Sequence, residues 1–255
     1  MSRISILLTN DDGIYADGIY ALREALNGLG RVTVVAPLAE KSAVGHAITL
    51  SDPLRVQKVH RNGSFFGYAV NGTPADCVKL GARCLLDKKP DLVISGINQG
   101  PNTATNIIYS GTVSAAAEGA IMGMPAIAVS LTSFTIKEFS YAAKFTLQLA
   151  RKVLRHGLPE GTLLNVNVPP LPEEEIAGVA LTRQGKGRYE ELYDKRIDPN
   201  KRTYYWLTGK KMILDEGEDV DDLVVEKKVV SVTPIHYELT NYSFLKEMEK
   251  WNIRQ

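Results

Sequence analysis

Residues 4–13 read ISILLTNDDG, and this stretch is the strongest indication of the fold. Its first six residues form the short apolar run that is typical of a buried strand. Turn-forming residues end the run, and apolar residues then recur at helical spacing from Ile19 to Leu29. A second buried strand is expected at Val32–Ala36. The opening of the chain therefore predicts the strand–helix–strand unit of a parallel sheet.

The same alternation continues through the chain as far as Pro169. Further strands are expected at 54–60, 65–70, 91–95, 126–131 and 163–168, and further helices at 73–87, 112–122 and 142–153. Together these elements predict an α/β protein with a three-layer, Rossmann-like, doubly wound and mostly parallel sheet. Cys77 and Cys84 are seven residues apart in one expected helix, so we expect them on one face, reduced and unbridged.

The character of the sequence changes after residue 178, where strand-like but polar segments follow one another. We expect one domain over 1–255, with its core at 1–178 and 231–255. The segment 179–230 is expected to form an appended β-hairpin that serves oligomerisation, because exposed strand edges pair readily between subunits.

Bulk composition excludes some partners. The chain has 30 basic and 29 acidic residues, a net charge of +1, so it lacks the basic excess of a nucleic-acid binder. No apolar run reaches membrane-spanning length, and no leader-peptide pattern begins the chain. We therefore expect a cytoplasmic protein without a membrane or a nucleic-acid polymer as partner.

Three loops are expected at the carboxyl ends of strands, where open α/β sheets bind ligands. The first, after Thr9, places Asp11 and Asp12 side by side. Adjacent carboxylates repel each other unless a cation lies between them, and Mg²⁺ or Mn²⁺ suits oxygen ligands. An ordinary Asn-Asp-Asp-Gly turn explains these residues equally well when they are taken alone.

The other two loops, 37–49 and 96–110, supply further polar groups. Ser42 and Asn98 offer a hydroxyl and an amide oxygen, while Asn102 offers a donor to an anion. Ser110, Gly111 and Thr112 begin a helix, whose free N–H groups and dipole favour an anion. Each group alone is also consistent with a loop or a helix cap. Their combination at one sheet edge predicts metal-assisted hydrolysis of a phosphate ester.

Taken together, these motifs resemble those of the SurE family of stationary-phase survival proteins, which are acid-phosphatase-like nucleotidases. The resemblance rests on six segments in the family's order: 8–13, Ser42, 95–102, 109–113, 165–169 and 230–236. One departure is Ala43, where many relatives have glycine.

The resemblance implies a divalent-metal-dependent enzyme that releases phosphate from nucleoside 5′- and 3′-monophosphates, with possible activity on short polyphosphate. It implies one Mg²⁺ or Mn²⁺ ion held by Asp11, Asp12, Ser42 and Asn98, catalytic roles for Asp11 and Ser110, and substrate contacts from Asn102, Ser110, Gly111 and Thr112. It also implies a homodimer or homotetramer that forms through the C-terminal hairpin.

Other classes fit less well. A signalling receiver domain needs an aspartate at the end of the third core strand, where this sequence has Ser95-Gly96. A haloacid-dehalogenase-like phosphatase needs Asp-x-Asp, and a dinucleotide-binding oxidoreductase needs Gly-x-Gly-x-x-Gly after the first strand. A non-catalytic module that binds metal and nucleotide stays open as the alternative.

Overall fold

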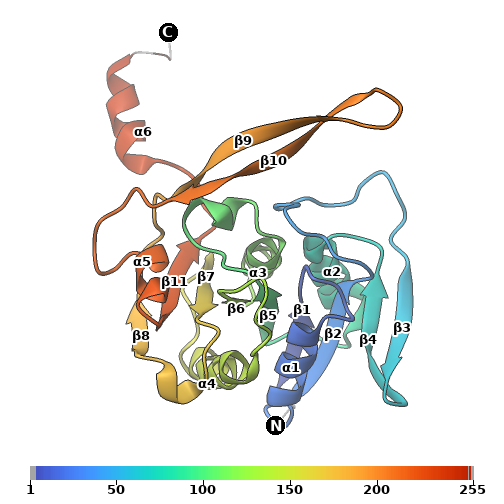
Figure 1. Cartoon of the computed structure of the whole chain (residues 1–255). Coiled ribbons are helices and arrows are strands. Elements are labelled where there is room, and N and C mark those ends of the chain that lie inside the picture. The colour runs from blue at the N-terminus through green and yellow to red at the C-terminus, as the bar shows by residue number, and fades with distance from the viewer. Residues whose placement is uncertain (1–3, 252, 254–255) are drawn as a thin grey trace.

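The computed structural model describes residues 4–251 and residue 253. The residues before Ile4, where no leader peptide is expected, lie outside this part. A nine-stranded sheet runs through the molecule in the order β3-β4-β2-β1-β5-β6-β7-β11-β8 (Figure 1). Six of its eight neighbouring pairs are parallel, and β3–β4 and β7–β11 are antiparallel. The expected doubly wound, mostly parallel sheet is confirmed.

The strands of the sheet are β1 (Ser5–Thr9), β2 (Arg31–Pro37), β3 (Val56–Arg61), β4 (Ser64–Val70), β5 (Leu92–Gln99), β6 (Ala126–Leu131), β7 (Thr162–Val168), β8 (Gly178–Leu181) and β11 (Val229–His236). The helices are α1 (Asp17–Ala25), α2 (Pro74–Leu80), α3 (Gly111–Ile121), α4 (Ser140–His156), α5 (Asp221–Glu226) and α6 (Tyr242–Met248). A separate hairpin joins β9 (Arg188–Ile197) to β10 (Thr203–Met212).

Two apolar cores lie on opposite faces of the sheet. Ile6 and Leu8 pack with α1 and α4, whereas Leu7 packs with α2 and α3. Successive side chains of a strand point to opposite faces, so a strand buried on both faces must be apolar throughout. This explains why Ile6, Leu7 and Leu8 are consecutive apolar residues.

The ligand-binding edge is defined by the strand order. β2 lies on one side of β1 and β5 lies on the other, so the chain changes direction across the sheet between β1 and β5. Such a switch point leaves a crevice beyond the carboxyl ends of the strands. The loops after β1 and β5 flank that crevice, as the sequence predicted.

Strand β5 is longer than expected, because Gly96–Gln99 continues it where a loop was predicted. Two residues of β5, Gly96 and Ile97, lie opposite the single residue Val129 of β6. This is a β-bulge, and a Cβ atom on Gly96 would lie 2.3 Å from the Val129 carbonyl oxygen. Bulges redirect the residues beside them, here Asn98.

The prediction that the two cysteines share a helix face is wrong. Both are free, but Cys77 is buried and Cys84 is exposed. The α-helical pitch ends at Leu80, and Gly81–Leu85 forms a π-helical turn. The wider π turn rotates the later residues relative to the first, so seven residues no longer return to the same face.

The C-terminal region divides differently from the predicted extension at 179–230. β8 joins the main sheet beside β11, and α5, which the sequence did not predict, packs against β11 and β7. Only β9 and β10 leave the sheet, and they cross over the molecule above the carboxyl ends of the strands (Figure 1). None of the helices in residues 4–251 combines the length and apolar character that crossing a membrane requires.

Candidate active site

Asp11 lies at the carboxyl end of β1 with its carboxylate against the first turn of α3. One carboxylate oxygen accepts the Thr112 N–H at 3.1 Å, and the other accepts the Thr112 hydroxyl. A Cβ atom on Gly111 would lie 2.8 Å from the Asp11 Cβ, so the glycine permits this close packing. Helix α3 therefore holds the aspartate at its positively polarised end.

Asp12 turns toward β5, where its carboxylate accepts the N–H of Gln99 at 3.1 Å. Burial, together with the smaller effect of the neighbouring Asp11 charge, raises the pKa of Asp12 to about 7. Burial likewise raises the pKa of Asp11, although the Thr112 hydrogen bonds oppose the shift. The pair is therefore poorly stabilised by the protein alone when both carboxylates are charged.

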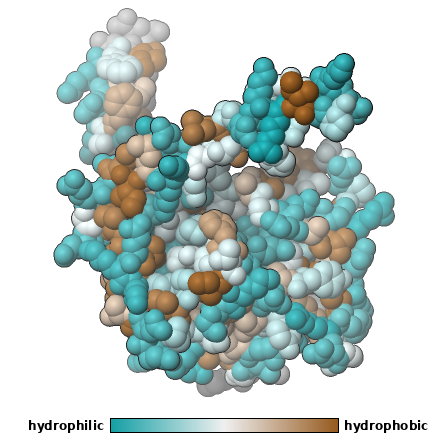
Figure 2. Space-filling model, in the orientation of Figure 1, coloured by the Kyte–Doolittle hydropathy of each residue, from teal (hydrophilic) through white to brown (hydrophobic). Residues whose placement is uncertain are grey.

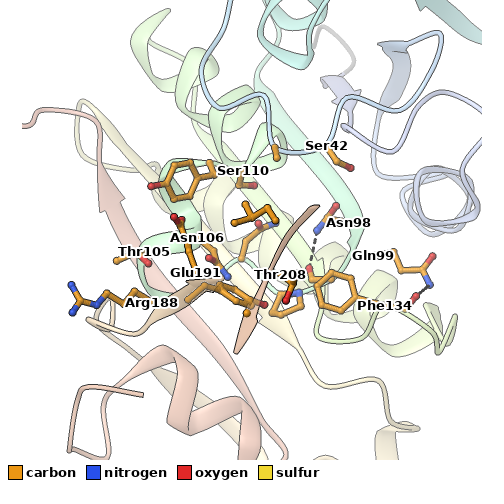
Figure 3. A pocket seen from close by; sticks show the side chains of 18 of the residues that line it. Ser42, Asn98, Gln99, Thr105, Asn106, Ser110, Phe134, Arg188, Glu191 and Thr208 are labelled. Carbon is orange, nitrogen blue, oxygen red and sulfur yellow. Dashed lines mark hydrogen bonds between the residues drawn. The ribbon is translucent and has the colours of Figure 1, made fainter. Parts of the chain in front are cut away.

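Asn98, at the end of β5, and Ser42, in the loop after β2, line the same cavity as Asp11. The Asn98 amide nitrogen donates to the Gly100 carbonyl at 2.7 Å, which leaves its amide oxygen on the side of Ser42 (Figure 3). Ser42 is exposed and its hydroxyl donates to Glu40 at 2.5 Å. The following Ala43 has φ of 54°, in the left-handed region that favours glycine.

Asn102 is buried in a network of amides beyond the ends of β6 and β7. Its amide nitrogen donates to the Ser130 hydroxyl at 2.7 Å, and its backbone N–H donates to Asn167 at 2.8 Å. The amides of Asn165 and Asn167 both donate to its carbonyl oxygen. The motif Asn165-Val166-Asn167 thus positions the Asn102 backbone, because alternate residues of one strand point to the same face of the sheet.

Ser110 caps α3 by accepting the N–H of Val113 at 3.0 Å. It also lines the cavity together with Asp11, Ser42, Asn98 and Asn102. Thr112 is fully buried, and both its donors are used by Asp11. The structure therefore brings the predicted residues to one place, with Gly111 and Thr112 behind Asp11.

The cavity has a volume of about 1210 Å³, and the hairpin forms one of its walls. Arg188, Glu191 and Thr208 of the hairpin line it opposite Asn98 and Ser110 (Figure 3). None of these residues was expected at the site from the sequence, because they follow Asp11 by more than 170 positions. Only their alternation in polar strands marked them as part of a hairpin.

Buried carboxylates hold the hairpin over the site. Asp221 accepts the N–H groups of Ala104 and Gly185, both at 2.9 Å. Asp222 accepts from Lys211 of β10, whose ammonium group also donates to the Thr103 hydroxyl at 3.1 Å. These bonds connect α5 and the hairpin to the loop that carries Asn102.

Another buried carboxylate, Glu118, joins three segments behind the site. It binds Lys79 of α2 at 2.8 Å and His46 at 2.9 Å, while lying on α3 itself. Burial opposes ionisation, but the hydrogen bonds from His46 and Lys79 outweigh it and lower the pKa of Glu118. The pairing gives His46 a structural partner on the helix that begins at the site.

The donor set fits a hard divalent cation. Asp11 and Asp12 supply two carboxylates, and Ser42 and Asn98 add a hydroxyl and an amide oxygen, all oxygen ligands of the kind that Mg²⁺ and Mn²⁺ prefer. A cation would also relieve the unfavourable burial of two adjacent charges. The described residues contain no cluster of three or more His, Cys, Asp or Glu side chains that could hold a metal ion, so serine and asparagine oxygens would have to complete this site.

Comparison with known proteins agrees with this geometry. The family model described as "Survival protein SurE" matches residues 6–191. The chain is 54% identical to a protein of Syntrophobacter fumaroxidans over 97% of this chain and 99% of that protein, and 52% identical to one of Heliobacterium modesticaldum over 96% and 91%. Both are named "5'-nucleotidase SurE".

A solved structure shows the same fold. The SurE protein from Aquifex aeolicus superposes with a TM-score of 0.85 at 48% identity, covering 97% of this chain and 99% of that one. The sequence motifs, the sheet with its site at the β1–β5 switch point, and these full-length similarities agree: the chain belongs to the SurE family.

Proposed function

We propose that this chain is a 5′-nucleotidase that hydrolyses nucleoside monophosphates with the aid of a divalent cation. The observation that carries the proposal is a cavity lined by Asp11 and Asn98, in which Asp11 is bonded to the start of α3 and the adjacent Asp12 is bonded to Gln99 of β5. Similar proteins are named 5′-nucleotidases, which supports this substrate class. Activity on 3′-monophosphates and on short polyphosphate belongs to the same proposal.

Asp11, Asp12, Ser42 and Asn98 would hold the cation. When bound, it supplies positive charge to the phosphoryl oxygens and acidity to a water molecule. Ser42 turns from Glu40 to take part, which a hydroxyl on an exposed loop does at little cost. Either Mg²⁺ or Mn²⁺ suits these ligands.

The chain itself would orient the phosphate. Ser110 presents its hydroxyl to the cavity at the start of α3, where the helix dipole favours an anion. Asn102 lines the same cavity as Ser110, and hydrogen bonds to Asn165 and Asn167 hold its backbone in place. A direct contact between Thr112 and the phosphate would require one of the two hydrogen bonds from Thr112 to Asp11 to break. The main role of Thr112 is therefore to orient Asp11.

The hairpin is proposed to join subunits into a homodimer or homotetramer of a single-domain chain that acts in the cytoplasm. Its two strands are exposed over nearly their whole length and carry large apolar side chains, which Figure 2 shows among hydrophilic ones. Tyr193 and Trp206 are 65% and 59% exposed. A second subunit would cover such side chains.

Phosphate release from a panel of nucleoside monophosphates tests the proposal. We expect no release in EDTA and restored release when Mg²⁺ or Mn²⁺ is added, with nucleotides preferred over simple phosphate esters. Absence of release with every metal would refute the hydrolase and leave a module that only binds metal and nucleotide. Metal-dependent stabilisation against heat, without turnover, would then support that module.

A further inference from the structure

We propose that Phe134 is the stacking platform for the nucleobase of the substrate. This inference rests on the proposed nucleotidase function and identifies the part of the site that recognises the base. Phe134 lies in the loop between β6 and α4, and its side chain is 68% exposed although it lines the same cavity as Asp11 and Asn98. The other motifs of the sequence assign no partner to a nucleobase.

The ring of Phe134 is held in place by β5. A Cβ atom on Gly100 would lie 2.4 Å from the ring, so the ring packs directly on the backbone of this glycine. The side chain of Gln99 donates to the Phe134 carbonyl at 2.8 Å, and Gly100 N–H donates to Leu131 at 2.9 Å. One side of the ring therefore contacts the backbone, while most of the residue is exposed at the cavity.

The loop around Phe134 contains a serine turn. The Ser133 hydroxyl accepts the N–H groups of Thr135 and Ile136 at 3.2 and 2.9 Å. Such serine turns order a short loop without strand or helix. An exposed aromatic ring on an ordered loop loses little entropy when a ligand covers it, unlike a ring on a flexible loop.

The ring of Phe134 lies beside the proposed cation site. The carbonyl of Gly100 accepts the amide of Asn98, a proposed cation ligand, and the ring of Phe134 covers the same glycine. In Figure 3 the ring lies between Asn98, Gln99 and Thr208 of the hairpin. A phosphate near the cation would thus place its sugar and base toward Phe134.

The remaining walls suit a heterocycle with a polar edge. Gln99, Asn106, Glu191 and Thr208 line the cavity and offer both donors and acceptors. Aromatic stacking accepts every base, since each has a π-face, whereas edge contacts discriminate between bases. The hairpin wall then affects base preference, and Phe134 supplies affinity for the base in general.

The test compares two phosphate esters that differ only in the base. Phe134→Leu keeps an apolar contact with Gly100 but removes the aromatic face. We expect it to raise KM for adenosine 5′-monophosphate by roughly 5- to 150-fold. KM for ribose 5-phosphate should stay within about two-fold, and kcat for both should change little. Phe134→Trp should restore tight binding of the nucleotide.

Ile136→Ala is the matched control, because Ile136 is 49% exposed in the same loop and does not line the cavity. It should leave both KM values unchanged. An equal rise in KM for both esters in Phe134→Leu would show that Phe134 only shapes the loop. An unchanged KM for the nucleotide would overturn the stacking role.

Calorimetry with adenosine separates this inference from the proposed hydrolysis. Adenosine has no phosphate, so its binding does not depend on turnover. Wild-type protein should bind it, and Phe134→Leu should bind it more weakly by the same factor as in the kinetic test. Failure of the wild-type protein to bind adenosine at millimolar concentration would overturn the base subsite, even if phosphate release succeeds.

Discussion

At the scale of single residues, the pair Asp11 and Asp12 is the most specific feature of the chain. Asp11 is fixed by Thr112, while Asp12 faces β5. We expect Asp12→Asn to lower kcat/KM for nucleotides by at least about 100-fold, because the proposed site then loses half of its carboxylate charge. Without a cation, the variant should unfold at a temperature no lower than wild type, since a buried charge beside Asp11 is removed.

Asp17→Asn is the control for this experiment. Asp17 is an exposed carboxylate at the start of α1 that pairs loosely with Arg61 and Lys137, at 3.9 and 3.6 Å. Steady-state kinetics should show nearly unchanged turnover in this variant. Turnover close to wild type in Asp12→Asn would remove Asp12 from the site.

At the scale of elements, Glu118 ties α3 to α2 and to the loop that carries Ser42. Its folded-state pKa is lowered, so its contribution is present above the unfolded pKa near 4.5 and is lost as pH falls through the folded value. We expect Glu118→Gln to lower the free energy of unfolding by about 1–2 kcal/mol at pH 7, a range reduced because the side chains of its partners Lys79 and His46 are partly exposed. The difference should shrink below pH 4.5.

Urea unfolding across pH 3.5–8 would measure this difference, a window set by the pKa direction of Glu118. The control is Glu174→Gln, because Glu174 is exposed in the connection between β7 and β8. Its free energy of unfolding should stay within about 0.5 kcal/mol of wild type at every pH. A difference between Glu118→Gln and wild type that does not depend on pH would mean that the ionised carboxylate is not what stabilises the fold.

At the scale of the whole molecule, the two ends of the hairpin have different surroundings. Its base lines the cavity, and its outer part carries exposed aromatic side chains. Replacing residues 194–206 by Asn-Gly would join the paired residues Tyr193 and Leu207 with a two-residue turn and keep the base intact. Light scattering should then report the mass of a single chain instead of an oligomer.

The shortened hairpin keeps Lys211, whose bond to Asp222 lies outside the replaced segment. Metal-dependent phosphate release therefore serves as the control for folding. A mass equal to that of the full-length protein would show that the outer hairpin does not join the subunits.

Local sequence patterns were sufficient for most of the sheet. The apolar runs at 4–9 and 126–131, and the helix signal at 112–122, each appear in the structure within about one residue. Periodicity and helix caps act over a few residues, so they can be read without the rest of the chain. The acidic pair after the first strand is local too, since any strand end of a parallel sheet opens onto the same edge.

Only the tertiary structure decided which distant residues surround the acidic pair and complete the cavity. Ala104 is held by Asp221, which is 117 positions away, and the cavity wall comes from residues 188–212. The amide of Asn102 turns to Ser130, and Phe134 meets Gly100 only because β5 and β6 are neighbours. Such contacts depend on the register of strands and on burial across the whole chain, for which no short pattern of residues exists. The sequence by itself therefore determined most of the sheet and, through the motifs of the family, the proposed cation ligands, and packing determined the rest of the site.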